Sequence, residues 1–346
     1  MTNENGFLIL YSKYYFVGYF MIKKLYPIFK DGVFSNAQFD SVLINTKKII
    51  LHYIFGIFNF SHLYHSKKHY AAIPQSIKKK DYDFLSDEKI MIIPLGHASV
   101  LIKYGKFSIL IDPVFYAVSF FFRRFTPDIS LAEIPNIDLV VYSHNHPDHF
   151  CKRTLREIIK HSQQVKIIAP LKFNEVIKNS FWFFRVKQEI ITLNWWEEYR
   201  VNEEISITGL PAIHWSQSNL IDRNKSLWSS WMITIKNKYI YFAGDSAYGE
   251  HFKLIRKVFP SVDVACLPIA PYEPKDIQID SHMNVEESYQ AFKELRSTFF
   301  LPIHWGVFAY GEEQLKDPIR KIILLMKKYN CLSRLICTVY NESFFI

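Results

Sequence analysis

The stretch Ser143-His144-Asn145-His146-Pro147-Asp148-His149-Phe150 is the segment around which the rest of this sequence can be arranged. It follows directly on residues 137–142, an apolar run that is typical of a buried strand. The loop that leaves such a strand is where α/β proteins usually place their chemistry. We therefore expect a strand that ends at this stretch and a functional site built around the loop.

The histidines and the aspartate of this loop form a pattern that suits a metal ion. His144 and His146 alternate along an extended backbone, so their side chains point to the same side. Pro147 then breaks the strand and turns the chain, which brings Asp148 and His149 into the same loop. Neutral imidazole and carboxylate are ligands that zinc and similar ions prefer. A His-rich surface turn is the alternative, but the ordered His-x-His-x-Asp-His set favours a metal site.

The composition excludes a disordered chain and leaves the partner open. The 346 residues are enough for one large domain or two modest ones, and 49% of them are hydrophobic. The 30 Phe and 21 Tyr residues exceed what a compact core needs, which indicates an apolar surface or an apolar partner. The formal charge of +9 suits anionic membrane surfaces or nucleic acid, and charge alone does not choose between them.

The cysteines and the first residues indicate the compartment. Cys151, Cys266, Cys331 and Cys337 show no paired spacing, so we predict neither a disulfide framework nor a zinc knuckle. Such a set fits a reducing compartment. Residues 1–5 lack the basic segment of a secretory signal. We therefore expect a cytoplasmic location.

Residues 1–85 are predicted to form a mostly helical, aromatic N-terminal extension, and residues 86–346 the main domain. Two apolar stretches dominate the extension, at residues 6–22 and 49–64. Lys13 interrupts the first, and the second is shorter than the roughly 20 residues of a spanning helix. Both are flanked by lysines, a pattern typical of segments that lie in a membrane interface. Helices that cap the core of the main domain are an equal alternative.

The main domain begins with paired strands and then alternates strands with helices. This order predicts an α/β fold with two sheets and with helices on the outside. The predicted strands are 90–94, 99–103, 107–111, 137–142, 165–169, 188–193, 205–210, 231–235, 239–242, 262–269, 298–303 and 334–339, and the predicted helices are 152–163, 171–179, 251–259, 284–296 and 318–329.

Further ligand candidates follow later strands of this pattern. Taken alone, His214 could be a core histidine, Asp245 a turn residue beside Gly244, and His304 the cap of a strand. Taken together with the His loop, they supply ligands for two metal ions and one carboxylate suited to bridging. Two ions about 3.5–4 Å apart can stabilise both the attacking and the leaving oxygen of a displacement at phosphorus. The complete candidate set is His144, His146, Asp148, His149, His214, Asp245 and His304.

The His loop resembles that of the metallo-β-lactamase superfamily. An ordered series of segments from about residue 90 onward is similar to one branch, the N-acyl-phosphatidylethanolamine-hydrolysing phospholipase D family. The series comprises Leu95–Val100, Ile111–Phe115, Ser143–His149, Asn194–Glu198, Asp222–Lys225, Leu227–Trp231, Phe242–Asp245, Tyr272–Pro274 and Ile303–Gly306.

The resemblance implies an αββα sandwich with two zinc ions per chain. It implies hydrolysis of a phospholipid phosphodiester by a hydroxide that bridges the ions and attacks phosphorus. The products would be an N-acylethanolamine and phosphatidic acid. By the same analogy one zinc takes His144, His146 and His214, the other takes Asp148, His149 and His304, and Asp245 bridges them.

Several residues are candidates for supporting roles. Asp148 and Asp245 count as catalytic as well as ligating, and His282 is a catalytic candidate that would contact the phosphate. Asp112 would hold a ligand histidine in orientation, or it is a turn residue before Pro113. For His97 and His282 a structural role is an equal interpretation. Candidates for contact with a ligand or with substrate are Asp112, His97, Tyr272, Arg123 and Arg124.

Aromatic clusters and charge bear on the partner. Residues 116–125 combine aromatic side chains with paired arginines, which suits an acyl groove or an interface with anionic headgroups, and ordinary core is the alternative. We expect a phospholipid substrate, peripheral membrane association and no nucleic acid, and a homodimer is left open. Two other functions stay open: hydrolysis of another phosphodiester or ester, and metal-stabilised lipid binding without turnover.

Overall fold

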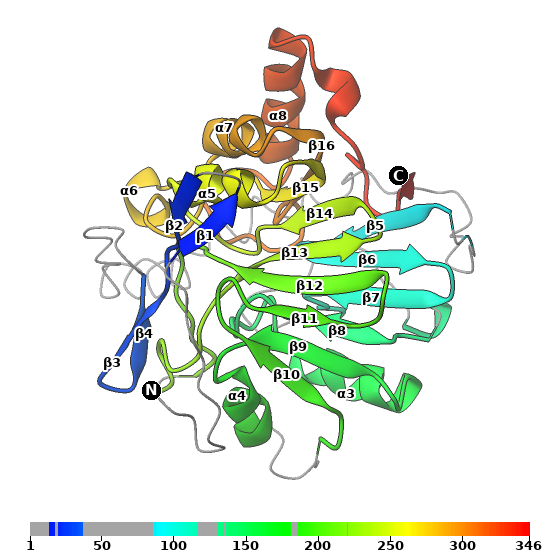
Figure 1. Ribbon diagram of the computed structural model, residues 1–346. Coiled ribbons are helices and arrows are strands. Elements are labelled where there is room, and N and C mark those ends of the chain that lie inside the picture. Colours follow the sequence, from blue (N-terminus) through cyan, green and yellow to red (C-terminus); the bar gives the residue numbers. More distant parts are fainter. Residues whose placement is uncertain are drawn as a thin grey trace.

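The computed structural model describes residues 14–17, 20–36, 86, 88–116, 131–134, 136–180, 186–219 and 221–346. Two sheets, one of seven strands and one of six, pack face to face. Helices lie on the outer face of each sheet (Figure 1). The predicted αββα sandwich is therefore confirmed for the main domain.

The seven-stranded sheet carries the His loop. Its strand order is β10-β9-β8-β7-β6-β5-β17, with parallel pairing from β7 to β10 and antiparallel pairing elsewhere. The strands are β5 (Ile90–Gly96), β6 (Ser99–Tyr104), β7 (Phe107–Ile111), β8 (Leu139–Val141), β9 (Lys166–Pro170), β10 (Ile190–Leu193) and β17 (Phe344–Phe345).

The six-stranded sheet carries the later ligand candidates. Its order is β11-β12-β13-β14-β15-β16, antiparallel from β11 to β14 and parallel from β14 to β16. The strands are β11 (Glu198–Arg200), β12 (Ile205–Leu210), β13 (Ser230–Ile235), β14 (Lys238–Phe242), β15 (Val262–Pro268) and β16 (Ser297–Ile303).

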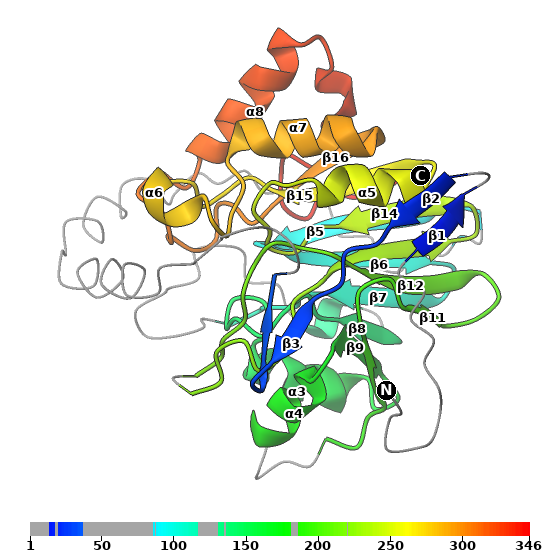
Figure 2. The same ribbon diagram turned by 60° about the vertical axis from the view of Figure 1, so that its left-hand side comes forward.

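The helices form two groups, one on each outer face (Figures 1 and 2). The first group packs on the sheet of the His loop, and the second packs on the other sheet. The first group consists of α3 (Lys152–His161) and α4 (Phe173–Ser180). The second group consists of α5 (His251–Val258), α7 (Val285–Leu295) and α8 (Asp317–Lys328). The connecting segments contain the short helix α6 (Lys275–Gln278) and the 3-10 helices η2 (Leu131–Glu133) and η3 (Leu332–Arg334).

Strand β5 shows why the apolar runs of this sequence fold as buried strands. Ile90 and Ile92 point into the core between the sheets, whereas Met91 and Ile93 point into the core beneath α3 and α4. Side chains alternate between the two faces of a strand. A strand with apolar residues on both faces needs cover on both sides, which the sandwich provides.

The described part of the N-terminal extension consists of strands. β1 (Tyr14–Val17) pairs with β2 (Phe20–Lys23), and β3 (Ile28–Lys30) pairs with β4 (Val33–Ser35), both antiparallel. The expectation of a mostly helical extension is wrong for these residues, because aromatic and β-branched residues favour strands. The second apolar stretch, at residues 49–64, lies outside the described residues.

One other expectation needs correction. Residues 334–339 do not form the predicted strand, because η3 ends at Arg334 and Cys337 has a φ of 51°, which a strand does not accommodate. The C-terminal strand is instead β17, which pairs with β5. The sequence also gave no signal for β11, a three-residue edge strand.

Within the ranges given above, no helix has both the length and the apolar character needed to cross a membrane. The hairpin of β1 and β2 lies beside α5 (Figures 1 and 2). The division of the chain at residue 85 stays a prediction.

Candidate metal centre

Four strand ends build one buried cluster of histidines and aspartates. The loop after β8 carries His144 to His149, and the segments after β12, β14 and β16 carry His214, Asp245 and His304. These side chains come from both sheets and meet at one edge of the sandwich. All of them are buried except His146, which is partly exposed.

Three histidine nitrogens and one carboxylate oxygen converge in a first group. His146 Nδ1 lies 2.8 Å from His144 Nε2 and 3.2 Å from His214 Nε2. Asp245 Oδ2 lies 3.8 Å from His144 Nε2 and 3.7 Å from His214 Nε2. Four ligands about 2.0–2.1 Å from a tetrahedral ion are roughly 3.3 Å apart. The first group therefore has close to the spacing of a metal site.

A second group shares Asp245 with the first. Asp245 Oδ1 lies 3.1 Å from His304 Nε2, and Asp245 Oδ2 lies 3.2 Å from His149 Nε2. Asp148 Oδ2 lies 3.5 Å from His304 Nε2 and 3.7 Å from His149 Nε2. One carboxylate thus faces both groups, which is the position that a bridging ligand requires.

Several atoms at this centre are buried without a hydrogen bond. They include His149 Nε2, His304 Nε2 and Asp245 Oδ1, which all face one another. A buried polar atom without a partner is costly, and such atoms in a folded protein usually have a partner of some kind. Imidazole nitrogens and carboxylate oxygens at this spacing fit divalent metal ions, so the residues present suit a two-metal centre.

Hydrogen bonds from the surrounding residues fix the orientation of the rings. His149 Nδ1 lies 2.7 Å from Asp112 Oδ2, and His214 Nδ1 lies 2.9 Å from the carbonyl oxygen of Ser281. Each ring donates through Nδ1, which leaves the lone pair of Nε2 for a metal. The Ser143 hydroxyl lies 2.9 Å from His144 Nδ1 and also contacts the Asp112 carboxylate. Asp112 thus lies where it can hold the ring of His149 in orientation.

Two more histidines lie at the centre. His97 Nε2 lies 2.9 Å from Asp148 Oδ2, and the centre of the His97 ring lies 3.9 Å from that of the His304 ring, with the two planes tilted by 46°. His282 Nδ1 lies 3.8 Å from Asp245 Oδ2 and makes no hydrogen bond. Both residues are therefore close enough to the donors to assist or to bind an ion.

The remaining sequence candidates have different positions. Tyr272 packs in the core beneath α7 and α8, with Lys321 Nζ 4.1 Å from the centre of its ring, so the structure places it in the core. Arg123 and Arg124 lie outside the described residues. Sequence reasoning missed Ser281 and Asn36, which contact His214 from segments that show no motif.

Burial controls the protonation of the ligands. It lowers the pKa of His146 and His214 to about 3, although nearby carboxylates oppose the shift. Burial alone would lower the pKa of His304, but Asp245 and Asp148 raise it to about 9. Burial alone would raise the pKa of Asp245, but His149 and His304 hold it well below its usual range. His144, His146 and His214 are therefore neutral, the state in which a histidine binds a divalent cation, whereas the carboxylates also raise the pKa of His149, so His149 and His304 would lose a proton when an ion binds.

The backbone at the centre includes uncommon conformations. Asp112 and His304 have positive φ values of 41° and 62°, which are rare for residues other than glycine and cluster at functional sites. Gly244 has a φ of +58°, and a Cβ there would lie 2.7 Å from the Cβ of Ser143. Glycine therefore allows the segment that carries Asp245 to approach the His loop.

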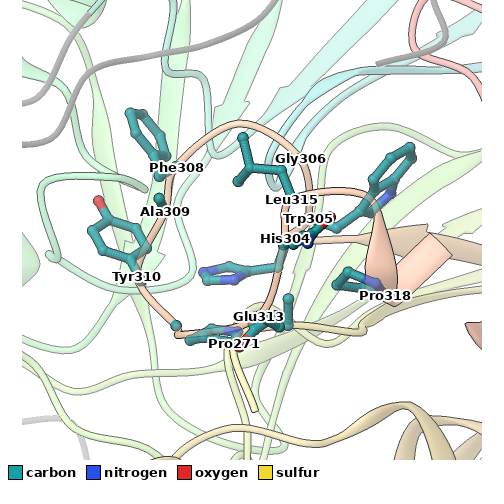
Figure 3. A pocket seen from close by; sticks show the side chains of 13 residues that line it. Pro271, His304, Trp305, Gly306, Phe308, Ala309, Tyr310, Glu313, Leu315 and Pro318 are labelled. Atoms are coloured by element: carbon teal, nitrogen blue, oxygen red, sulfur yellow. The ribbon is translucent and has the colours of Figure 1, made fainter. Parts of the chain in front are cut away.

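An apolar wall borders the centre on the side of His304. A small pocket beside this residue is lined by Phe308, Tyr310 and Pro271, and Figure 3 shows the His304 imidazole with Tyr310 to its left and Pro271 below it. The Phe308 ring meets the His97 ring edge-on at 4.9 Å. The site therefore combines polar donors with apolar surroundings.

Comparison with known proteins gives a consistent result. Residues 108–305 match the model of a family described as beta-lactamase superfamily domain. The N-acyl-phosphatidylethanolamine-hydrolyzing phospholipase D 1 of Caenorhabditis elegans is 32% identical over 256 residues, which cover 70% of this chain and 72% of that protein. The mitochondrial N-acyl-phosphatidylethanolamine-hydrolyzing phospholipase D of Saccharomyces cerevisiae is 31% identical, over 67% of this chain and 50% of that protein.

Solved structures show the same fold. Igni18, a metallo hydrolase from the archaeon Ignicoccus hospitalis, superposes with a TM-score of 0.57 at 20% sequence identity. The match covers 75% of this chain and 98% of that one. At this identity the likeness concerns the fold alone.

Proposed function

This chain belongs to the beta-lactamase superfamily and is a metal-dependent hydrolase of that fold, and from this premise we propose that it is a phospholipase D-type phosphodiesterase. The substrate would be an N-acyl-phosphatidylethanolamine-like phospholipid, cleaved to an N-acylethanolamine and phosphatidic acid. The observation that carries the proposal is the pair of donor groups that share Asp245. The names of the relatives from Caenorhabditis elegans and Saccharomyces cerevisiae support the choice of substrate.

The donor set suits two zinc ions. Histidine nitrogens with carboxylate oxygens are typical zinc ligands. When bound, a pair of such ions lowers the pKa of water and neutralises charge on phosphate oxygens. The residues of the chain prepare this chemistry, because Asp112, Ser143 and Ser281 orient the rings and burial keeps His144 and His214 neutral.

His282 is suited to contact the phosphate. Its Nδ1 is buried and makes no hydrogen bond, and its ring lies 5.2 Å from that of His214. Burial lowers the pKa of His282 to about 3, so the ring is neutral at pH 7 and offers one N–H donor. A hydrogen bond from this ring would orient a phosphate oxygen beside Asp245.

An arginine near the first donor group also suits an anionic substrate. The Trp215 ring lies 4.2 Å from that of His146, and the Arg223 guanidinium lies 4.7 Å from the centre of the Trp215 ring. Arg223 Nη1 is buried without a hydrogen bond. A cation with spare donors beside a metal site suits the negative charge of a phosphodiester.

We also propose peripheral association with a membrane surface. The hairpin of β3 and β4 exposes apolar side chains, with 48% of Ile28, 47% of Phe29 and 38% of Val33 accessible. Lys30 is exposed on the same hairpin, and the chain carries a formal charge of +9. Apolar side chains beside lysines suit the boundary between headgroups and acyl chains of an anionic membrane.

The proposal is tested with purified protein and defined lipids. Vesicles that contain N-acyl-phosphatidylethanolamine are incubated with the wild type and with His146→Ala, and the products are identified by mass spectrometry. We expect N-acylethanolamine and phosphatidic acid from the wild type alone. If the wild type instead cleaves another phosphodiester or an ester, and His146→Ala does not, the fold serves a different substrate. If neither protein turns over any substrate and both bind vesicles equally, lipid binding without catalysis is the better account.

A further inference from the structure

One side chain of the N-terminal extension reaches the metal centre directly. The Asn36 side-chain amide donates through Nδ2 to the carbonyl oxygen of His214 at 3.1 Å. The backbone N–H of His214 donates to Asn36 Oδ1 at 3.3 Å. Both backbone polar groups of a ligand candidate are thus bound by one amide, although 178 positions separate the two residues.

We infer that Asn36 is a positioning residue for His214, so that the segment of residues 24–36 forms part of the metal centre. The inference concerns metal binding, and it holds for any substrate of the site. It also means that the N-terminal extension and the main domain form one functional unit, because a residue of the extension would hold one ligand of the first donor group in position.

The segment that carries His214 has one backbone hydrogen bond, from the Ala247 N–H to the Ile213 carbonyl oxygen at 2.8 Å, and its other hydrogen bonds involve side chains. β12 ends at Leu210, and the residues that follow have left the sheet. Ile213 N–H donates to Ser246 Oγ at 2.9 Å, and the carbonyl oxygen of Ala212 accepts from Trp228 Nε1 at 3.0 Å. Asn36 completes this set at His214, at the point where the backbone must direct an imidazole into the centre.

Asn36 is itself held in place. Its Oδ1 also accepts from Trp228 Nε1 at 3.1 Å. Two residues earlier, Phe34 is buried against Trp195 and Trp228, and its N–H donates to the carbonyl oxygen of Asn224 at 2.8 Å. At the other end of the segment, the Leu25 carbonyl accepts from Trp196 Nε1 at 2.6 Å. The amide therefore comes from an anchored segment and can fix the backbone that it binds.

The geometry of the first donor group makes this support relevant. His214 Nε2 lies 3.2 Å from His146 Nδ1, while Nδ1 of the same ring is held by Ser281. Metal sites tolerate deviations of about 0.2 Å in ligand distance. Loss of a group that orients a ligand typically costs about 10–100-fold in metal affinity.

The test compares variants in a metal titration that needs no substrate. Metal-free wild type, Asn36→Ala and Ser35→Ala are titrated with cobalt(II), with visible absorption and calorimetry as readouts. Ser35 is the exposed neighbour of Asn36 on β4 and serves as the matched control. We expect one of the two cobalt equivalents to bind Asn36→Ala at least about 10-fold more weakly and with an altered spectrum, whereas Ser35→Ala matches the wild type.

A second variant separates positioning from general loosening of the segment. Phe34→Leu weakens the packing of the same hairpin but keeps Asn36, so it should lower the melting temperature and leave the cobalt spectrum unchanged. If Asn36→Ala binds both equivalents as the wild type does, or if Phe34→Leu changes the spectrum as strongly as Asn36→Ala, the inference is wrong. If Asn36→Ala does not fold, Asn36→Ser serves the same test, because its hydroxyl is too short to reach both groups of His214.

Discussion

Asp112 shows how one buried carboxylate can control a metal centre. It binds His149 Nδ1 at 2.7 Å and the Ser143 N–H at 2.7 Å, so it orients one ligand and fixes the start of the His loop. We predict that Asp112→Asn lowers metal affinity about 10–100-fold, measured by competition with a chelator. Asp138→Asn is the control. Asp138 is the residue before β8, its carboxylate also accepts a hydrogen bond from a backbone N–H, that of Ser108, and it lies outside the donor set. Equal effects of the two substitutions would contradict this role.

Gly244 tests the close approach of two loops. We predict that Gly244→Ala destabilises the protein by about 1–3 kcal/mol or more, because the substitution adds strain at positive φ to a contact with Ser143. Gly32→Ala also places an alanine at positive φ, +81°, but its Cβ would have no atom within 4 Å, so it should reduce the stability of the protein by less. Urea denaturation of the metal-free proteins measures both. A cost for Gly32→Ala as large as that for Gly244→Ala would exclude the contact as the cause.

His251 gives a pH dependence of stability with a defined sign. Burial lowers the pKa of His251 to about 3, from an ordinary value of 6.5. Between these pH values His251 is protonated in the unfolded chain but neutral in the folded protein. Its contribution to the free energy of unfolding therefore falls as the pH drops below 6.5, by up to about 1.4 kcal/mol per pH unit.

The matching variant is His251→Gln. We predict that it weakens the loss of stability between pH 7 and pH 5, measured by urea denaturation of metal-free protein. Other buried histidines contribute to both proteins, so the difference between the curves isolates His251. Parallel curves over this range would show that His251 is not the group responsible.

The residues of the site differ in how well the sequence predicts them. The His loop is recognisable because its ligands lie within six positions, and His214, Asp245 and His304 follow strands of an alternating pattern. Asn36 had no such signal, because its contact with His214 depends on tertiary packing. Tyr272 belongs to a segment shared with the family, yet it packs in the core.

Among the elements, α7 has a clear start in the sequence. Asn284 accepts from the Glu287 N–H at 2.8 Å, and the Glu287 carboxylate accepts from the Asn284 N–H at 3.0 Å, which together form a capping box. We predict that Asn284→Ala lowers stability by about 1 kcal/mol and that Asn284→Ser restores most of it, since serine also caps. Thermal denaturation is the measurement, and a serine variant as unstable as the alanine variant would argue against the cap.

Local patterns predicted most elements of the main domain and failed where local signals compete. The helix at 284–296 and the hairpin of β13 and β14 have strong caps or alternation, and both are present. The segment at 334–339 carries strand-forming residues, but Cys337 turns the chain at positive φ so that β17 can pair with β5. At residues 14–35 apolar composition indicated helices, whereas pairing between neighbouring segments produced strands.

At the scale of the whole molecule, the metal centre joins the two sheets. The donors come from loops of both sheets, so bound metal should stabilise the folded state as a whole. We predict that chelation lowers the melting temperature and that added zinc restores it, because an ion at 1,000 times its dissociation constant contributes about 4 kcal/mol. Scanning calorimetry measures this, and a melting temperature unaffected by chelation and zinc would contradict it.

The overall architecture was predictable because the order of strands and helices allows few folds. The position of the N-terminal segment was not, because its anchors are single contacts such as that between Leu25 and Trp196. Such contacts leave no periodic pattern in the sequence. By our inference the functional unit therefore includes residues 24–36, which the sequence analysis places in the N-terminal extension.

If this centre directs water to the phosphorus of a phospholipid, as we propose, then oxygen from the solvent must enter the phosphate product, which isotope labelling measures. The wild type is incubated with N-acyl-phosphatidylethanolamine in water enriched in oxygen-18, and both products are analysed by mass spectrometry. We predict one labelled oxygen in phosphatidic acid, none in the N-acylethanolamine, and no label incorporation with His146→Ala. Label in the N-acylethanolamine or in a released fatty acid, or the absence of any cleavage, would contradict it.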